Sequence, residues 1–145
     1  MIAMGINITF LGCCDEALSF YTNIFDGVIE KKVTFGEMKN MLGGEDIVSG
    51  KEQYIFNAKL SIKIGENKIY LFLNDSPSIL FSNVKGVNQD NLTIVLEVES
   101  KELVQEYYYK LAEGGKTNIL PRENSAGEFE GSLIDRYGVC WIIKC

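Results

Sequence analysis

Residues 6–10 and 14–25 read INITF and CDEALSFYTNIF, and they decide the fold of this chain. Apolar side chains of the first stretch stand at every second position, a period that predicts a strand with one buried face. In the second stretch apolar residues recur at helical spacing, which predicts an amphipathic helix ending at Asp26-Gly27. Asp15 is expected to cap this helix at its start.

The same order of elements returns 86 residues later, where Ile94 takes the place of Ile8. Residues 92–98, LTIVLEV, predict a strand, and Ser100 is expected to cap a helix over 101–113. Further strands are expected at 28–35, 53–64 and 68–73 in the first half, and at 117–120, 127–135 and 139–145 in the second. Each half is therefore strand, helix, then three strands.

The two halves span about 1–75 and 91–145, with a linker over 76–90. A repeat unit that cannot bury its own apolar face must pack against its copy. We therefore expect one α+β domain in which both halves share a core.

Composition excludes several classes of function. The chain has 145 residues with 14 basic and 20 acidic side chains, a net charge of −6, and this acidity argues against nucleic acid as a partner. The absence of histidine removes Ser-His and Cys-His dyads and every imidazole metal site. No apolar run is long enough for a membrane span, and Met1–Met4 lack the basic region of a signal peptide, so we expect a cytoplasmic protein with reduced thiols.

Several short segments, in this order along nearly the whole chain, carry a family resemblance. They are CDEALSFY at 14–21, FDG at 25–27, TFGEM at 34–38, IFNAKL at 55–60, EGGK at 113–116 and DRYGVCW at 135–141. The series resembles PhnB-like proteins of the glyoxalase, bleomycin-resistance and extradiol-dioxygenase superfamily, also called vicinal oxygen chelate proteins. The resemblance implies two βαβββ modules whose curved mixed sheets surround a cleft, in a homodimer.

That superfamily commonly holds a divalent metal through one ligand from each of four strands. By resemblance, these positions fall in this sequence at Asn7 or Ile6, at Thr93 or Leu92, at Tyr70 or Phe72, and at Ile143. None of these is a good ligand for a hard divalent ion, which needs several oxygens or imidazoles. We therefore expect no metal and no other cofactor.

Strand alternation gives the expected cleft wall. If Ile8 and Phe10 face the helix, the odd positions of the first strand face the cleft, and the repeat places the matching residues of the second half there too. The aromatic residues of the later strands complete this wall, unless they simply fill core. The expected ligand-binding residues are Asn7, Thr9, Asn57, Lys59, Tyr70, Phe72, Thr93, Glu97, Trp141 and Ile143.

Candidates for acid–base chemistry are few. Lys59 and Glu97 could pair across the cleft, or one of them could serve as an acid or base, and Glu128 lies two residues before Glu130 on one strand face. The alternative is solvated charge on open sheet. The four cysteines lack the spacing of a zinc site and are expected to be idle thiols.

Three hypotheses about the function follow from these observations. The first is a metal-free protein that binds a small organic ligand, cationic or aromatic, without transforming it. The second is an enzyme of the same superfamily, lyase or dioxygenase-like, with a variant metal or with metal-independent acid–base chemistry at Lys59, Glu97 or Glu128. The third is a structural dimer with a vestigial cleft. Tyr107–Tyr109 cannot all face the core, and they add a surface for a homodimer contact.

Overall fold

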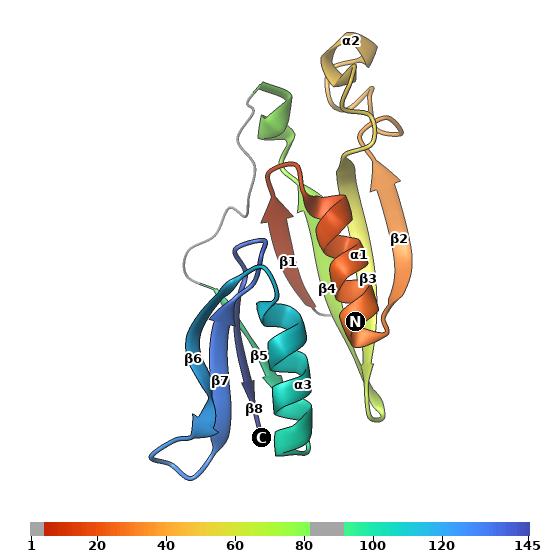
Figure 1. Cartoon of the computed structure of the whole chain (residues 1–145). Helices are drawn as coiled ribbons and strands as arrows, with labels where there is room; N and C mark the ends of the chain where they lie inside the picture. Colours follow the sequence, from red (N-terminus) through yellow and green to blue (C-terminus); the bar gives the residue numbers. More distant parts are fainter. Residues whose placement is uncertain (1–4, 82–91) are drawn as a thin grey trace. The chain divides into compact units, whose positions relative to one another are not determined.

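The computed structural model describes residues 5–81 and 92–145. The chain divides into two compact units, Met1–Asn88 and Gln89–Cys145 (Figure 1). Most of the predicted linker, from residue 82 to residue 90, lies outside the described residues.

The first unit contains a four-stranded sheet with one long helix on it (Figure 1). Its strands lie in the order β1-β4-β3-β2, where β1 pairs with β4 in parallel and the other pairs are antiparallel. Its elements are β1 (Gly5–Phe10), α1 (Cys14–Phe25), β2 (Val28–Thr34), the short α2 (Glu45–Val48), β3 (Ile55–Ile64), β4 (Asn67–Asp75) and a 3-10 turn (Pro77–Phe81).

The second unit repeats this plan with the strand order β5-β8-β7-β6, and β5 pairs with β8 in parallel. Its elements are β5 (Thr93–Glu97), α3 (Lys101–Ala112), β6 (Lys116–Glu123), β7 (Phe129–Ile134) and β8 (Cys140–Lys144). The predicted α+β fold of two βαβββ modules with mixed sheets is confirmed.

Each helix covers one face of its own sheet. In the first unit the alternation predicted for β1 holds, because Ile8 and Phe10 are fully buried, as are Ala17 and Tyr21 of α1. In the second unit Tyr108 of α3 is fully buried against the sheet. Burial of apolar area on this scale is the main stabilising contribution to folding.

The starts of the two helices differ. Ser100 caps α3 as predicted, because its side chain accepts a hydrogen bond from the Leu103 amide. The predicted cap of α1 is wrong: the N-cap residue is Cys13, whose side chain makes no capping bond, and Asp15 lies inside the first turn. The carboxylate of Asp75, at the end of β4, accepts the Cys14 amide instead. A cap from a distant strand leaves no local sequence signal, and so Asp15 was mistaken for it.

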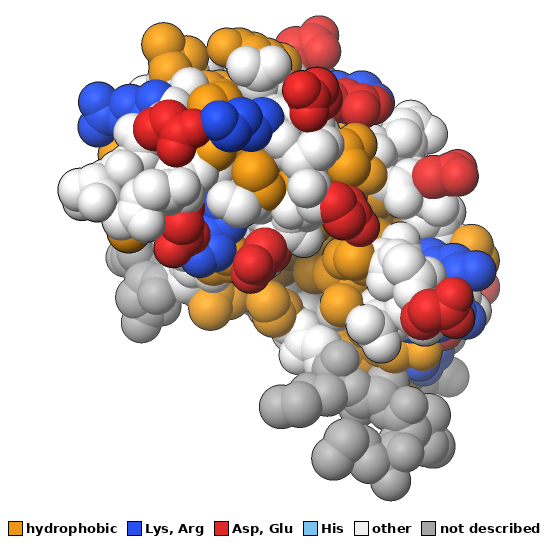
Figure 2. All heavy atoms as spheres, turned by 90° about the horizontal axis from the view of Figure 1, so that it is seen from below, with side chains coloured by type: hydrophobic (Ala, Val, Ile, Leu, Met, Phe, Trp, Pro, Cys, Tyr) orange, Lys and Arg blue, Asp and Glu red, His pale blue; other side chains and the backbone are white. Residues whose placement is uncertain are grey.

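On the face shown in Figure 2, acidic and basic side chains are intermingled and hydrophobic side chains lie between them. Among the described residues, no helix has the length and apolar character required to cross a membrane.

Candidate functional site

The open face of each sheet, defined as the face turned away from its helix, carries most of the predicted site residues. On the first sheet it begins with a polar cluster of three side chains. Asn74 Oδ1 accepts hydrogen bonds from Asn7 Nδ2 at 3.1 Å and from Thr9 Oγ1 at 3.0 Å. Asn7 and Thr9 were predicted from alternation, and Asn74 was missed. It follows Phe72 by two residues on β4, so the same alternation could have found it.

Next to this cluster lie two aromatic rings and a lysine. Phe72 stands between Asn7 and Lys59 in the strand register. Lys59 Nζ lies 4.4 Å from the centroid of the Tyr70 ring and 5.9 Å from that of Phe72. A cation held over an aromatic face in this way is attracted by the ring quadrupole. The sequence therefore placed Lys59, Tyr70 and Phe72 on the correct face, together.

Lys59 has a carboxylate partner that the sequence did not reveal. Glu30 Oε2 lies 3.3 Å from Lys59 Nζ. A hydrogen bond from Ser61 and the nearby Lys59 lower the pKa of Glu30 below its ordinary value. Glu30 sits where the register of β2 on β3 shifts, between Ile29 and Lys31. Such a bulge breaks the period of two, which is why sequence alternation could not place Glu30.

Asn57 completes the predicted residues of this face. It is half-buried next to the fully buried Ala58, so it lies on the open side of β3. Ala58, Leu60 and Ile62 face the core, as alternation predicts.

On the second sheet the prediction is correct for β5 and wrong for β8. Thr93 and Glu97 are exposed and lie on the open face, since the intervening Ile94 and Leu96 are buried. Trp141 and Ile143, however, are 2% and 0% exposed.

These two residues lie on the side of α3. Ile143 pairs with Gly131, and a Cβ built at Gly131 would lie 2.8 Å from the Tyr108 ring. Trp141 Nε1 donates to the buried Asp135 carboxylate at 2.9 Å. Trp141 and Ile143 are therefore core residues. Residues 139–143, VCWII, are apolar throughout, so hydrophobic alternation could not decide their face.

The open-face residues of β8 are those that alternate with Trp141 and Ile143. They are Cys140, Ile142 and Lys144, which pair in register with Thr93, Val95 and Glu97. Lys144 Nζ lies 2.8 Å from Glu128 Oε2. This hydrogen bond, with smaller contributions from Glu97 and Glu130, raises the pKa of Lys144.

Two of the three candidate acid–base residues have ion-pair partners within their own units. Lys59 pairs with Glu30, and Glu128 is engaged by Lys144.

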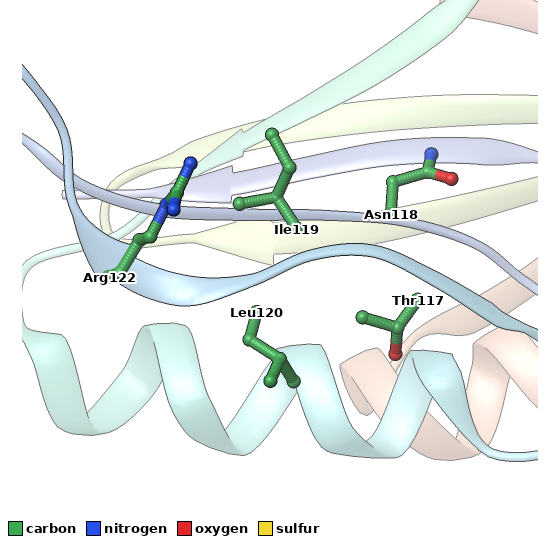
Figure 3. Close-up of a pocket in the computed structure, with 5 residues that line it drawn as sticks. All are labelled: Thr117, Asn118, Ile119, Leu120 and Arg122. Atoms are coloured by element: carbon green, nitrogen blue, oxygen red, sulfur yellow. The ribbon is translucent and has the colours of Figure 1, made fainter.

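A depression of about 410 Å³ lies along β6. It is lined by Thr117, Asn118, Ile119, Leu120 and Arg122. Asn118, Ile119 and Arg122 point to one side of the strand, and Thr117 and Leu120 point to the other (Figure 3). Ile119 pairs with Ser132 and Arg122 with Glu130, which places both on the open face of the second sheet.

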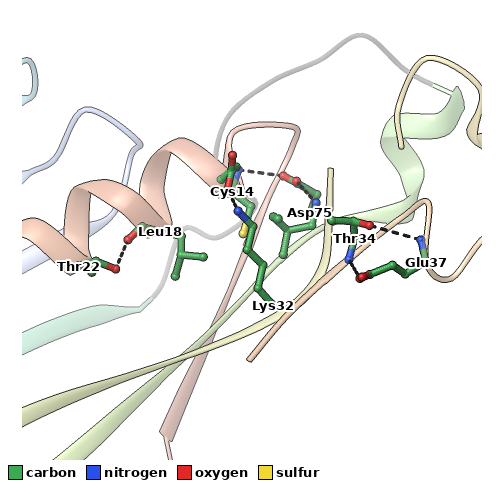
Figure 4. Close-up of polar contacts among 9 residues, drawn as sticks. Cys14, Leu18, Thr22, Lys32, Thr34, Glu37 and Asp75 are labelled. Atoms are coloured by element: carbon green, nitrogen blue, oxygen red, sulfur yellow. Dashed lines mark hydrogen bonds and ion pairs between the residues drawn. The ribbon is translucent and has the colours of Figure 1, made fainter. Parts of the chain in front are cut away.

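Two buried titratable groups with raised pKa, Cys14 and Asp75, lie outside both open faces, near the start of α1 (Figure 4). Burial raises the pKa of the Cys14 thiol, and the neighbouring Asp75 raises it further. Burial also raises the pKa of Asp75, against the effect of three amide hydrogen bonds. A thiol that stays protonated is a poor nucleophile, so Cys14 is structural.

The metal of the superfamily does not fit the residues present. The amide of Asn7 is engaged by its neighbours, Tyr70 and Phe72 offer aromatic rings, and Ile143 points away from the open face. A hard divalent cation needs several oxygen or imidazole ligands to replace its water. Within residues 5–81 and 92–145, no group of three or more His, Cys, Asp or Glu side chains could hold a metal ion.

Comparisons with known proteins give consistent relatives. No family model matches the chain. Protein YjdN of Escherichia coli (strain K12) is 24% identical over 140 residues, which are 94% of this chain and 90% of YjdN. The crystal structure of protein PA1353 from Pseudomonas aeruginosa has a TM-score of 0.77 and 25% identity, covering 100% of this chain and 98% of that one.

Two further solved structures carry descriptive names. One is a PhnB protein from Bacillus cereus described as a putative 3-demethylubiquinone-9 3-methyltransferase, with a TM-score of 0.72, 23% identity and coverage of 97% and 96%. The other is a glyoxalase/bleomycin resistance protein/dioxygenase family enzyme from Burkholderia phytofirmans PsJN, with a TM-score of 0.58, 15% identity and coverage of 98% and 97%.

Proposed function

We propose that this chain, a PhnB-like protein with the glyoxalase-type fold, binds a small organic ligand with an aromatic ring on the open face of its first sheet, without a metal. The resemblance predicted from the sequence is confirmed by these relatives. The observation that carries the proposal is the grouping of Tyr70, Phe72 and the Asn7–Thr9–Asn74 cluster on one sheet face. Apolar surface with a few placed polar groups is typical of small-molecule sites.

The chemistry of this face favours an aromatic ligand. Lys59 already occupies the face of Tyr70 and is neutralised by Glu30, so a ligand cation would have to displace a bound ammonium. We therefore place the ligand ring against Phe72 and its polar atoms against Asn7 and Thr9. Stacked aromatic rings contribute about 0.5–1.5 kcal/mol beyond their buried area.

Binding without turnover is the reading that the acid–base candidates support. The ion pairs of Lys59 and Glu128 hold both side chains to partners, and Glu97 is exposed. The putative methyltransferase description of the PhnB relative belongs to that protein, and no methyl-donor loop follows the first strand of this chain. We place the protein in the cytoplasm, because its four cysteines are all free.

A ligand screen tests this proposal. We expect at least one compound from a set of neutral and cationic aromatics to raise the melting temperature, since a ligand that binds only the folded state stabilises it by mass action. Phe72→Ala should weaken its binding about tenfold, measured by calorimetry, because a stacked ring is lost. EDTA should leave the affinity unchanged.

Phe81→Ala provides the matched control, because Phe81 lies in the same unit and is 80% exposed. Circular dichroism checks that both variants fold. If Phe81→Ala weakens binding as much as Phe72→Ala, or if no aromatic compound binds, the ligand site lies elsewhere and the proposal is wrong.

We also propose that the chain forms a homodimer. Tyr109 of α3 is 58% exposed, beside the buried Tyr108, and so offers an aromatic surface that a second copy could cover. Sedimentation equilibrium at micromolar concentration should give twice the chain mass of 16.3 kDa, and Tyr109→Ser should shift the equilibrium towards monomer. A single species at the chain mass, at every concentration and salt level, would contradict the proposal.

A further inference from the structure

We propose that the open face of the second sheet binds an organic anion, a carboxylate or phosphate ester joined to an apolar chain, and that Arg122 binds its anionic group. This inference is independent of the ligand proposed for the first sheet, because it rests on different residues and a different chemistry.

The guanidinium of Arg122 is free to bind a ligand. Its guanidinium makes no hydrogen bond or ion pair with any residue in 5–81 or 92–145, although Glu130 lies opposite it in the register of β6 on β7. Lys144 also lies opposite Glu130, but its ammonium group is engaged by Glu128 at 2.8 Å. A planar guanidinium presents donors in a fork that matches a carboxylate or phosphate. Of these two cations, Arg122 is therefore the one that is available to a ligand.

A depression large enough for a small molecule lies beside Arg122. Arg122 and Ile119 line the depression of about 410 Å³ from the same side of β6, with the Asn118 amide next to them (Figure 3). This volume is in the range of small-molecule sites, which extends from about 300 to 1,000 Å³. On this side of β6 the depression thus combines one anion-binding group, one amide and one apolar side chain, while Thr117 and Leu120 line it from the other side.

A largely apolar row of side chains continues from the depression across the sheet. Val95, Ile142, Ser132 and Ile119 form one row across four strands, by the register of the sheet. Val95 is 54% exposed and Ile119 is 42% exposed. Covering these two side chains with a hydrocarbon chain is favourable, at roughly 25 cal/mol per Å² of apolar area removed from water.

Charge places the anionic group of the ligand at Arg122. Glu97 and Glu130 lie opposite Lys144, which is also paired with Glu128, so a ligand anion finds no free cation at that position. An ammonium group placed at Arg122 is repelled by the guanidinium, whereas an anionic group pairs with it. The occupant we infer therefore has its anionic group at Arg122 and its apolar part along Ile119, Ile142 and Val95.

Titration with hexanoate, followed by ¹H–¹⁵N NMR on the full chain, tests the proposal. We expect saturable shifts of the Arg122 Nε–Hε and Ile119 amide signals, and weaker or no binding of acetate, hexanol and hexylammonium. Hexyl phosphate distinguishes the two anion types: tighter binding than hexanoate identifies a phosphate ester, and weaker binding a carboxylate. Arg122→Gln should weaken hexanoate binding about tenfold or more, because a charge-assisted hydrogen bond is lost.

Lys116→Gln is the matched control. Lys116 is an exposed cation on the same strand, pairs with Ile134 on the same face, and does not line the depression. Its loss should change the affinity by less than about twofold, as for a distant surface charge. Arg122→Lys should recover part of the binding. Equal losses in Lys116→Gln and Arg122→Gln, equal binding of hexylammonium, or no saturable shift at Arg122 would each overturn the proposal.

Discussion

Replacing Asp75 by alanine is expected to lower the free energy of unfolding by about 3–5 kcal/mol, because it leaves buried amide donors without an acceptor. Asp75 is 1% exposed, and its carboxylate accepts the amides of Gly12 at 2.9 Å, Cys14 at 3.1 Å and Ile55 at 2.9 Å. These bonds hold the loop after β1, the start of α1 and the start of β3 to the end of β4. Urea unfolding followed by circular dichroism measures the effect.

Asp15→Ala is the matched control, because Asp15 is an exposed carboxylate in the first turn of the same helix, paired with Lys32. Its loss should cost less than about 1 kcal/mol, as is typical of surface pairs and first-turn acids. Asp75→Asn should fall between the two, since its amide nitrogen must face an N–H donor. Equal costs for Asp75→Ala and Asp15→Ala would show that the buried carboxylate does not hold these segments together.

Asp135→Ala is expected to lower the free energy of unfolding by about 3 kcal/mol, for a similar reason in the second unit. Asp135 is 3% exposed. Its carboxylate accepts the Tyr137 amide at 2.9 Å, the Val139 amide at 3.0 Å and Trp141 Nε1 at 2.9 Å. Trp141 is the single tryptophan of the chain, so its fluorescence during urea unfolding reports directly on this unit.

A double-mutant cycle with Trp141→Phe separates the indole bond from the two backbone bonds. The coupling between Asp135→Ala and Trp141→Phe should be about 1 kcal/mol or more, the size of one buried hydrogen bond to a charged group. Additive effects of the two substitutions would mean that the indole contact contributes nothing, and a cost of Asp135→Ala near zero would refute the role of this carboxylate.

The order of elements could be predicted because two periods stand out in the sequence. Ile8 and Phe10 alternate with polar residues, and Ser100 provides a local cap, so strand, helix and their repeat follow from neighbouring residues. The role of Asp75 could not be predicted in this way. Its three donors lie 20, 61 and 63 residues away along the chain, and nothing local marks it as their partner.

The residues of the candidate site were also predicted correctly in some strands and wrongly in others. Asn7 and Thr9 were placed on the correct face because they alternate with apolar residues along their strand. Residues 69–73, IYLFL, are apolar throughout, so the family resemblance, and not a period, pointed to Tyr70 and Phe72. Residues 139–143 are also apolar at successive positions, and there the family position at Ile143 led to the wrong face for Ile143 and Trp141. The residue of the second unit that corresponds to Phe72 is Cys140. Phe72 pairs with Asn7, Cys140 pairs with Thr93, and the 86-residue repeat relates Asn7 to Thr93.

The position of β4 between β1 and β3 has a consequence for the time course of folding. Gly5 of β1 pairs with Tyr70, so β1 has no strand partner until a segment about 65 residues later has formed. Contacts between residues so far apart in sequence close large loops, and proteins rich in them fold slowly. Until then the segment INITF, with its apolar side chains and unpaired amides, is exposed to other unfolded chains. During folding, β1 is therefore at risk of intermolecular pairing until β4 forms, and pairing with β4 then covers one of its two edges.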